Sequence, residues 1–266
     1  MNIYLHELKA LRKSVIIWTC ALIALSAMFF SIYPSMARDA VDFKKILSSY
    51  PAPVRAMLGI NIDYITSILG FYSMIFSFIV LCGAIQAMNM GVSILSKEAR
   101  ERTADFLLVK PISRSVIVTA KLLAALTMLI ITNLLFYVAS LVIVNAVKTG
   151  DYSVKLFSMI NLTLFFIQLI FLAIGLAISV FFNKLKAVLP ISLGVVFGSY
   201  IIGALISTGN NETARFISPF KYFDITYIIK NSRYETSYLV AAAAIVAAAI
   251  VISYIVYTKK DIHAVS

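Results

Sequence analysis

Long uncharged apolar runs alternate with short charged segments along this sequence of 266 residues. A helix of about 20 residues crosses the hydrocarbon core of a bilayer, and six of the runs are long enough to do so. We therefore predict six transmembrane helices. They cover residues 14–33, 66–95, 122–147, 156–182, 187–206 and 238–257. The predicted fold class is all-α integral membrane, with residues 1–266 forming a single transmembrane domain.

The segment before the first run, MNIYLHELKALRK, has an amphipathic pattern. It predicts an interfacial helix over residues 1–13 that leads into the first span. Ser35, Met36 and Ala37 have the small-x-small pattern of a signal-peptide cleavage site. The apolar run that precedes them is longer than the roughly 7–15 residues of a signal-peptide core, so we interpret it as a retained span.

The composition agrees with a membrane protein, since 61% of the residues are hydrophobic and only 13% are charged. Soluble domains carry about 25% charged residues. The formal net charge is +11, but no basic arm or nucleic-acid-binding motif accompanies it, so we expect no nucleic acid among the partners. In a membrane protein an excess of Lys and Arg reports loop orientation and contact with anionic membrane lipids.

The distribution of positive charge predicts that both termini are cytoplasmic. With six spans, the inner segments hold more Lys and Arg than the longer outer ones, as the positive-inside rule requires. The inner residues are Lys9, Arg12, Lys13, Lys97, Arg100, Arg102, Lys110, Arg114, Lys121, Lys184, Lys186, Lys259 and Lys260. The expected location is a bacterial-type plasma membrane.

Two outer loops have helical or aromatic patterns of their own. Residues 34–65 have the apolar spacing and prolines of short interfacial helices. Residues 207–237 are rich in aromatic side chains, which suit the headgroup level of a bilayer. This second loop either anchors the protein at the interface or contains a re-entrant pair of short helices.

The most charged stretch is SKEARERTADFLLVKPISR, residues 96–114, between the second and third spans. It predicts a cytoplasmic helix with Ser96 as its N-cap, ending before Pro111. Glu98 and Arg102 are spaced i and i+4 in the favourable order. Mixed charge beside apolar side chains suits a protein partner better than an anionic membrane surface. We expect this helix to dock a soluble subunit.

This stretch resembles the segment between spans two and three of ABC transporter permeases of the type-2 exporter family. That segment has a glutamate, a charged run, Gly-Thr, an acidic residue, Leu-Leu, then Pro-Val/Ile-Ser-Arg and a lysine seven residues on. The matching residues here are Glu98, Thr103, Asp105, Leu107, Leu108, Pro111, Ile112, Ser113, Arg114 and Lys121, while Arg102 replaces the glycine. HELKALRK, SPFKYF and YTKKDI resemble other family features, so the likeness covers nearly the whole chain.

The resemblance implies a half-transporter without catalysis of its own. Two permease subunits would form the pathway, and two ABC ATP-binding subunits would bind ATP, so this chain needs no cofactor. The implied homodimer would export cargo. The implied coupling residues are Lys97, Glu98, Arg100, Glu101, Arg102, Thr103, Asp105, Phe106, Leu107, Leu108, Pro111 and Arg114.

Other functions have less support from the residues. The sequence contains no G-x-x-x-x-G-K-[ST], G-x-S-x-G or H-E-x-x-H motif, which argues against an intrinsic ATPase or hydrolase. An ion-coupled secondary transporter usually carries acidic or histidine residues inside its spans, and the six runs contain none. That carrier and a purely structural membrane subunit are the alternatives to a permease.

Polar and small side chains inside the spans have structural interpretations. The amides Gln86, Asn89, Asn133, Asn145, Asn161 and Gln168 either hydrogen-bond between helices, which we favour, or contact cargo. Gly194 and Gly198 form a small-x-x-x-small pair, which allows close helix approach either within one subunit, which we favour, or across the dimer. Cys20, Cys82 and the two histidines have no ligand-spaced partners, so we expect no metal site. The apolar spans favour an amphipathic peptide or lipid-like cargo.

Overall fold

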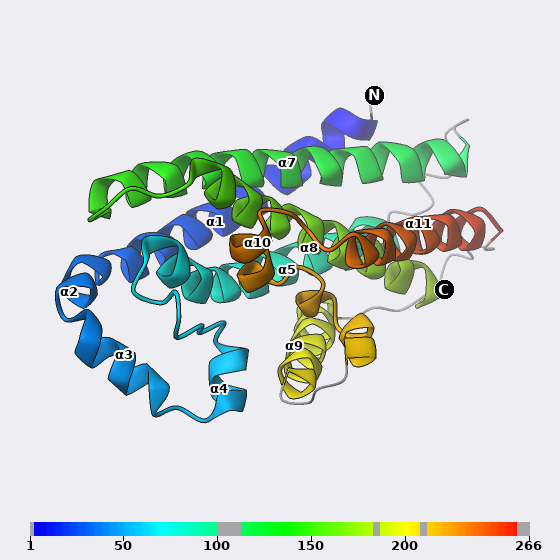
Figure 1. Cartoon of the computed structure of the whole chain (residues 1–266). Coiled ribbons are helices and arrows are strands. Elements are labelled where there is room, and N and C mark those ends of the chain that lie inside the picture. Colours follow the sequence, from blue (N-terminus) through cyan, green and yellow to red (C-terminus); the bar gives the residue numbers. More distant parts are fainter. Residues whose placement is uncertain (1–2, 101–112, 183–186, 208–211, 260–266) are drawn as a thin grey trace.

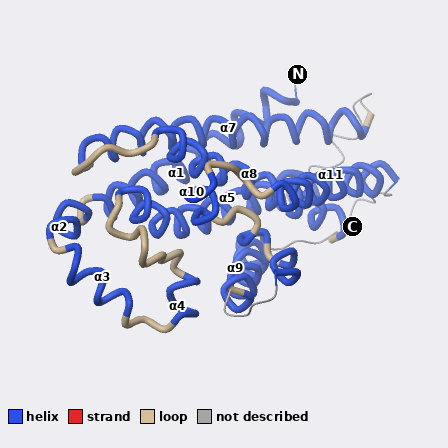
Figure 2. Tube along the Cα trace, viewed as in Figure 1, coloured by secondary structure: helices blue, strands red, loops and turns tan. Residues whose placement is uncertain are grey.

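The computed structural model describes residues 3–100, 113–182, 187–207 and 212–259. Six long helices dominate it, and no strand occurs in these ranges (Figure 2). All six are long and apolar enough to cross a membrane, which confirms the predicted fold class. They are α1 (Ile3–Phe30), α5 (Ile68–Arg100), α7 (Arg114–Val147), α8 (Val154–Phe181), α9 (Val188–Ile206) and α11 (Thr236–Lys259).

Short helices occur in two loops, after α1 and after α9 (Figure 1). The loop after α1 lies at the end of the bundle away from the N and C labels, whereas the loop after α9 packs beside α8 and α9. The first loop holds α2 (Tyr33–Arg38), α3 (Ala40–Ser48) and α4 (Ala52–Met57). The second holds the 3-10 helices η1 (Glu212–Ile217) and η2 (Pro219–Lys221), then α10 (Ile225–Asn231).

Local sequence explains several of the helix ends. The Ser153 hydroxyl accepts a hydrogen bond from the Leu156 amide at 3.4 Å and so caps the start of α8. Asp224 caps α10 by accepting from the amides of Thr226 and Tyr227, at 2.8 and 3.4 Å. Pro190 lies in the first turn of α9, where its missing N–H removes no intrahelical bond.

Helices α5 and α8 form the centre of the bundle. In the most apolar stretch of α5, 78% of the residues are buried, compared with 17% in α11. The two central helices cross closely because Gly91 and Gly175 face each other. A Cβ on Gly91 would overlap the carbonyl oxygen of Leu172, and one on Gly175 would lie 2.7 Å from that of Met88. Glycine is therefore needed at this crossing.

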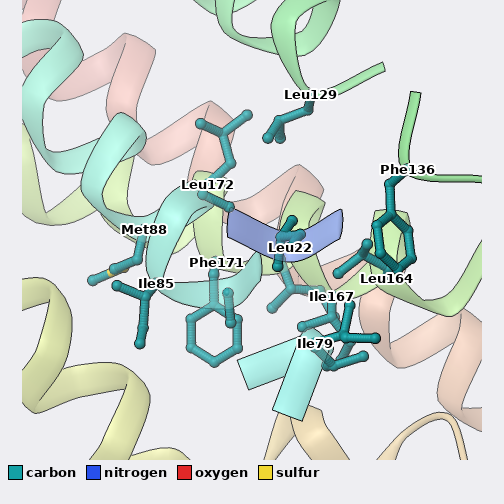
Figure 3. Packing of buried hydrophobic residues seen from close by; sticks show 14 of the residues in the cluster. Leu22, Ile79, Ile85, Met88, Leu129, Phe136, Leu164, Ile167, Phe171 and Leu172 are labelled. Atoms are coloured by element: carbon teal, nitrogen blue, oxygen red, sulfur yellow. The ribbon is translucent and has the colours of Figure 1, made fainter. Parts of the chain in front are cut away.

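The apolar core joins four helices. Figure 3 shows Leu22 of α1 between side chains of α5, α7 and α8. Its neighbours in this view are Ile79, Ile85, Met88, Leu129, Phe136, Leu164, Ile167, Phe171 and Leu172. Large apolar side chains on the outside, such as Ile17, Leu134 and Leu205, remain exposed. Exposed apolar surface of this extent is expected of helices that face lipid.

The structure corrects two predictions made from the sequence. Ser96 is not an N-cap, because α5 continues through it to Arg100 and its hydroxyl donates to the Val92 carbonyl at 2.6 Å. Gly194 and Gly198 make no close packing contact, since a Cβ at either position would meet nothing within 4 Å. The predicted packing of this pair within one subunit is therefore wrong.

The N-terminal segment and the two loops can be compared with their predictions. From Ile3 onward, the predicted interfacial segment continues without a break into the first span as α1. The short helices predicted for residues 34–65 are present as α2, α3 and α4. In residues 207–237, the described part has two 3-10 helices and α10, and its position relative to a bilayer stays a prediction.

Candidate functional site: the junction beside residues 101–112

The segment predicted to dock a partner connects α5 to α7. The structure places Lys97, Glu98 and Arg100 in the last turn of α5 and makes Arg114 the first residue of α7. The other predicted coupling residues lie outside the described residues. They are Glu101, Arg102, Thr103, Asp105, Phe106, Leu107, Leu108 and Pro111. The Glu98–Arg102 pair and the helix that would carry it therefore stay predictions.

The start of α7 is attached to the last span. The guanidinium of Arg114 donates to the carbonyl oxygen of Thr258 at 3.4 Å. One turn further, the hydroxyls of Thr119 and Tyr254 lie 2.8 Å apart. Both contacts join α7 to α11. A displacement of the α7 start would therefore also act on the last transmembrane helix.

A buried ion pair ties the same region to two further helices. The ammonium nitrogen of Lys121 on α7 lies 3.0 Å from a carboxylate oxygen of Glu7 on α1. It also donates to the carbonyl oxygen of Ile94 on α5 at 2.7 Å. The side chains of Lys121 and Glu7 are 1% and 6% exposed. One side chain therefore connects three long helices near the ends of α5 and α7 that flank residues 101–112.

Burial of these two charged groups carries a cost in hydration free energy. An isolated ammonium group would lose several kcal/mol of hydration on transfer into the protein, and a paired carboxylate with a second acceptor offsets that loss. The Ile94 carbonyl is such an acceptor, because a carbonyl oxygen has a second lone pair besides the one used within the helix. The pair therefore fixes the relative positions of α1, α5 and α7 more specifically than apolar contacts would.

Reasoning from sequence missed this pair. Lys121 lies one residue before the predicted third span and Glu7 lies in the predicted interfacial helix, so both were assigned to the membrane surface. The sequence features that could have indicated the pair are an acidic residue, Glu7, in an amphipathic segment and a lysine, Lys121, directly before a long uncharged run. Those features do not reveal that the two side chains meet.

Amide side chains form a second polar group, deeper in the bundle. Gln86 donates to the Thr132 hydroxyl at 3.2 Å, and Gln168 donates to the side-chain oxygen of Gln86 at 3.2 Å. Asn133 donates to the side-chain oxygen of Gln168 at 2.6 Å. A further bond of 3.3 Å links Thr132 to Thr19. This network joins α1, α5, α7 and α8.

The hydrogen-bonding capacity of these amides is largely used between helices. In a hydrocarbon environment a polar group without a hydrogen-bond partner raises the free energy, and bonds between helices avoid that increase. The structure thus brings Gln86, Asn133 and Gln168 together, as the favoured interpretation requires. Asn161 similarly accepts from Tyr72 at 2.9 Å. In contrast, Asn145 bonds within its own helix, to the carbonyl of Leu141.

Among the described residues, no group of three or more His, Cys, Asp or Glu side chains could hold a metal ion. The described part of the chain thus offers structural polar contacts and an ion pair at a helix junction.

Comparison with known families decides the class. The family model described as "ABC-2 family transporter protein" matches residues 1–262. The chain belongs to the ABC-2 transporter family. It is thus a multi-pass membrane component of an ABC transporter, and family membership implies a partnership with an ABC ATP-binding subunit. No curated protein matches the sequence.

Proposed function

We propose that this chain is the permease subunit of an ATP-driven exporter, with residues 96–114 as the docking segment for the ATP-binding subunit. Two copies form the translocation pathway, and ATP is hydrolysed by the partner subunits. The permease itself performs no catalysis. Both termini and the docking segment face the cytoplasm of a bacterial-type cell.

The observation that carries this proposal is the junction of Lys121, Glu7 and Ile94. Any force applied to residues 101–112 enters the transmembrane part through the end of α5 and the start of α7. The ion pair and the Ile94 carbonyl join both helices to α1 close to that point. The contacts of Arg114 and Thr119 extend the connection to α11. A partner moving one short segment thereby acts on four spans.

The cargo class rests on the character of the spans. The described long helices are apolar, and Gln86, Asn133 and Gln168 are engaged in hydrogen bonds between helices. A strongly hydrophilic cargo such as a sugar would find few free polar groups along them. An amphipathic peptide or a lipid-like molecule fits this surface better.

Charge reversal at the docking segment tests the proposal. We expect E98R and R102E each to weaken association with the cognate ATP-binding subunit, because each reverses a charge of the proposed docking segment and would break the predicted Glu98–Arg102 pair. The double swap E98R/R102E should recover part of the association. Co-purification of the two subunits from membranes, with quantification of the ATPase per permease, measures the effect.

Asp42 on α3 provides the matched control. It is exposed at the opposite end of the bundle, so D42R changes the charge equally without touching the docking segment. If E98R, R102E and the double swap all co-purify with as much ATPase as D42R, residues 96–114 do not dock the partner.

An ion-coupled carrier is the second candidate, and the buried Lys121–Glu7 pair is the observation that favours it. Ionisable pairs within transmembrane helices often belong to proton or ion relays. Reconstituted vesicles distinguish the two functions. Transport that needs a proton or sodium gradient but neither nucleotide nor ATPase would support the carrier and overturn the exporter.

A further inference from the structure

A cavity of about 640 Å³ lies among the short helices of the two loops and the long helices α5, α8 and α9. This volume is within the range of roughly 300–1,000 Å³ that is usual for sites of small molecules. Its wall combines α4 and the loop after it, α5, α8, α9 and the segment from η1 to α10. The wall residues that matter here are Arg55, Asn61, Arg215, Lys221 and Asp224.

Contacts between distant segments hold this cavity in shape. The side-chain amide of Asn61 donates to the Thr226 hydroxyl at 3.3 Å, which links the loop after α4 to α10. Ser218 donates to the carbonyl of Ser199 at 2.7 Å and attaches the start of η2 to α9. Gly203 permits that approach, because a Cβ there would lie 2.6 Å from the Ser218 hydroxyl. The charged wall residues are thus positioned before any ligand binds.

Two of the charged wall residues already have counter-charges or hydrogen-bond partners. Arg215 donates to both carboxylate oxygens of Glu235, at 3.2 and 2.7 Å, and lies over the Tyr238 ring at 4.3 Å. Burial alone would lower the pKa of Arg215, but the Glu235 carboxylate more than compensates and raises it. The Asp224 carboxylate is engaged by the α10 amides. The charge of Arg215 is thus balanced by Glu235, whereas Asp224 keeps its negative charge beside the cavity.

Lys221 and Arg55 differ from these two. Within the described part of the chain, the Lys221 ammonium has no hydrogen bond or ion pair, and burial lowers the pKa of Lys221 despite the nearby Asp224. The Nε atom of Arg55 is buried and has no hydrogen-bond partner among the described residues. Buried polar atoms in native proteins almost always have a hydrogen-bond partner. An anion bound in the cavity would supply one.

We propose that this cavity binds a phosphate group, with Arg55 and Lys221 as its counter-charges. A guanidinium fork and an ammonium are the side-chain groups that most often bind phosphate. Tyr200, Ser207 and Thr226 also line the cavity.

The phosphate belongs either to the headgroup of an anionic lipid or to free phosphate. Apolar side chains in the same wall, Val80, Ile167, Phe220, Phe223 and Ile225, would accept part of a lipid tail. The proposal does not depend on export, because the cavity lies within one isolated chain and no residue of the docking segment lines it.

Thermal unfolding of the purified full-length chain in detergent tests the site. Separate titrations use inorganic phosphate, phosphatidylglycerol, and diacylglycerol, which has no phosphate. We expect phosphate or phosphatidylglycerol to raise the melting temperature and diacylglycerol to leave it unchanged, since a ligand that binds only the native state stabilises it. A response to phosphatidylglycerol at much lower concentration identifies the lipid as the source. Equal responses identify the free anion.

Variants locate the response in the cavity. R55Q/K221Q should weaken the apparent affinity by about tenfold or more, because both charge-assisted hydrogen bonds to the phosphate are lost. K230Q/R233Q is the matched control, because Lys230 and Arg233 are exposed, lie nearby in sequence and do not line the cavity. If the double variant does not fold, the single variant K221Q tests the same site.

Three results would overturn the site. The first is an unchanged melting temperature with both phosphate-containing ligands. The second is an equal affinity of the wild type and the cavity variants. The third is an equal loss in K230Q/R233Q, which would mean that general surface charge attracts the anion.

Discussion

Lys121 places a positive charge inside the protein, where desolvation strongly disfavours it. The Lys121 ammonium is stabilised by the Glu7 carboxylate and the Ile94 carbonyl, which belong to two other helices. Removing one member of such a pair leaves the other charged and buried, whereas replacing both by apolar side chains removes the penalty for both. The pair thus contributes specificity to the helix arrangement more than net stability.

We expect K121M to lower the free energy of unfolding by about 3–5 kcal/mol, because it leaves the Glu7 carboxylate buried without its partner. The double variant E7L/K121M should recover most of this loss. Thermal and denaturant unfolding in detergent measures the difference. K155M is the control, since Lys155 is exposed on α8. A K121M protein as stable as K155M would contradict this account of the pair.

At the scale of helices, the length of each apolar run is the feature of the sequence that best predicts the fold. All six spans are recognisable because each must cover the bilayer with uncharged residues. Which helices occupy the centre is not recognisable, since α5 and α11 are similarly apolar but differ greatly in burial. Gly91 and Gly175 decide the central crossing, yet Gly194 and Gly198 have the more conspicuous spacing in sequence. Spacing within one helix does not reveal the partner helix.

The candidate junction was predictable only in part for a related reason. The charged stretch between α5 and α7 is visible in sequence because its composition differs from that of its surroundings. The Glu7–Lys121 contact joins positions 114 residues apart. Such a contact depends on the relative rotation of α1 and α7, which no local pattern specifies.

Substitution of the crossing glycines tests the central packing. We expect G91A and G175A each to lower the free energy of unfolding by about 1–3 kcal/mol, because the added methyl group meets backbone of the facing helix. G194A and G198A are matched controls with open space around the new Cβ, and alanine favours helix there. Equal unfolding curves for G91A and G194A would show that α5 and α8 do not cross at Gly91.

For the whole molecule, two chemically different regions lie apart. One holds the start of α7, the end of α11 and the Lys121 junction. The other holds the short helices and the cavity of Arg55 and Lys221. In the proposed orientation, the first region is on the cytoplasmic side, where the ATPase would bind. Any communication between the two regions runs through the long helices.

Chemical labelling tests this orientation. In a background without Cys20 and Cys82, S49C should react with an impermeant maleimide on intact cells, because Ser49 is exposed after α3. K9C, exposed near the start of α1, should react only after permeabilisation. The reverse pattern would place the termini outside the cell.

The long helices differ widely in length, and this difference has a consequence for the surrounding lipid. At 1.5 Å per residue, the 34 residues of α7 span about 51 Å, whereas the 19 residues of α9 span only about 28 Å. Hydrocarbon about 30 Å thick accommodates α9 only if it stands nearly upright or the bilayer thins beside it. Lipids with longer acyl chains should therefore impose hydrophobic mismatch first at α9, which makes that side of the protein the most sensitive to membrane thickness.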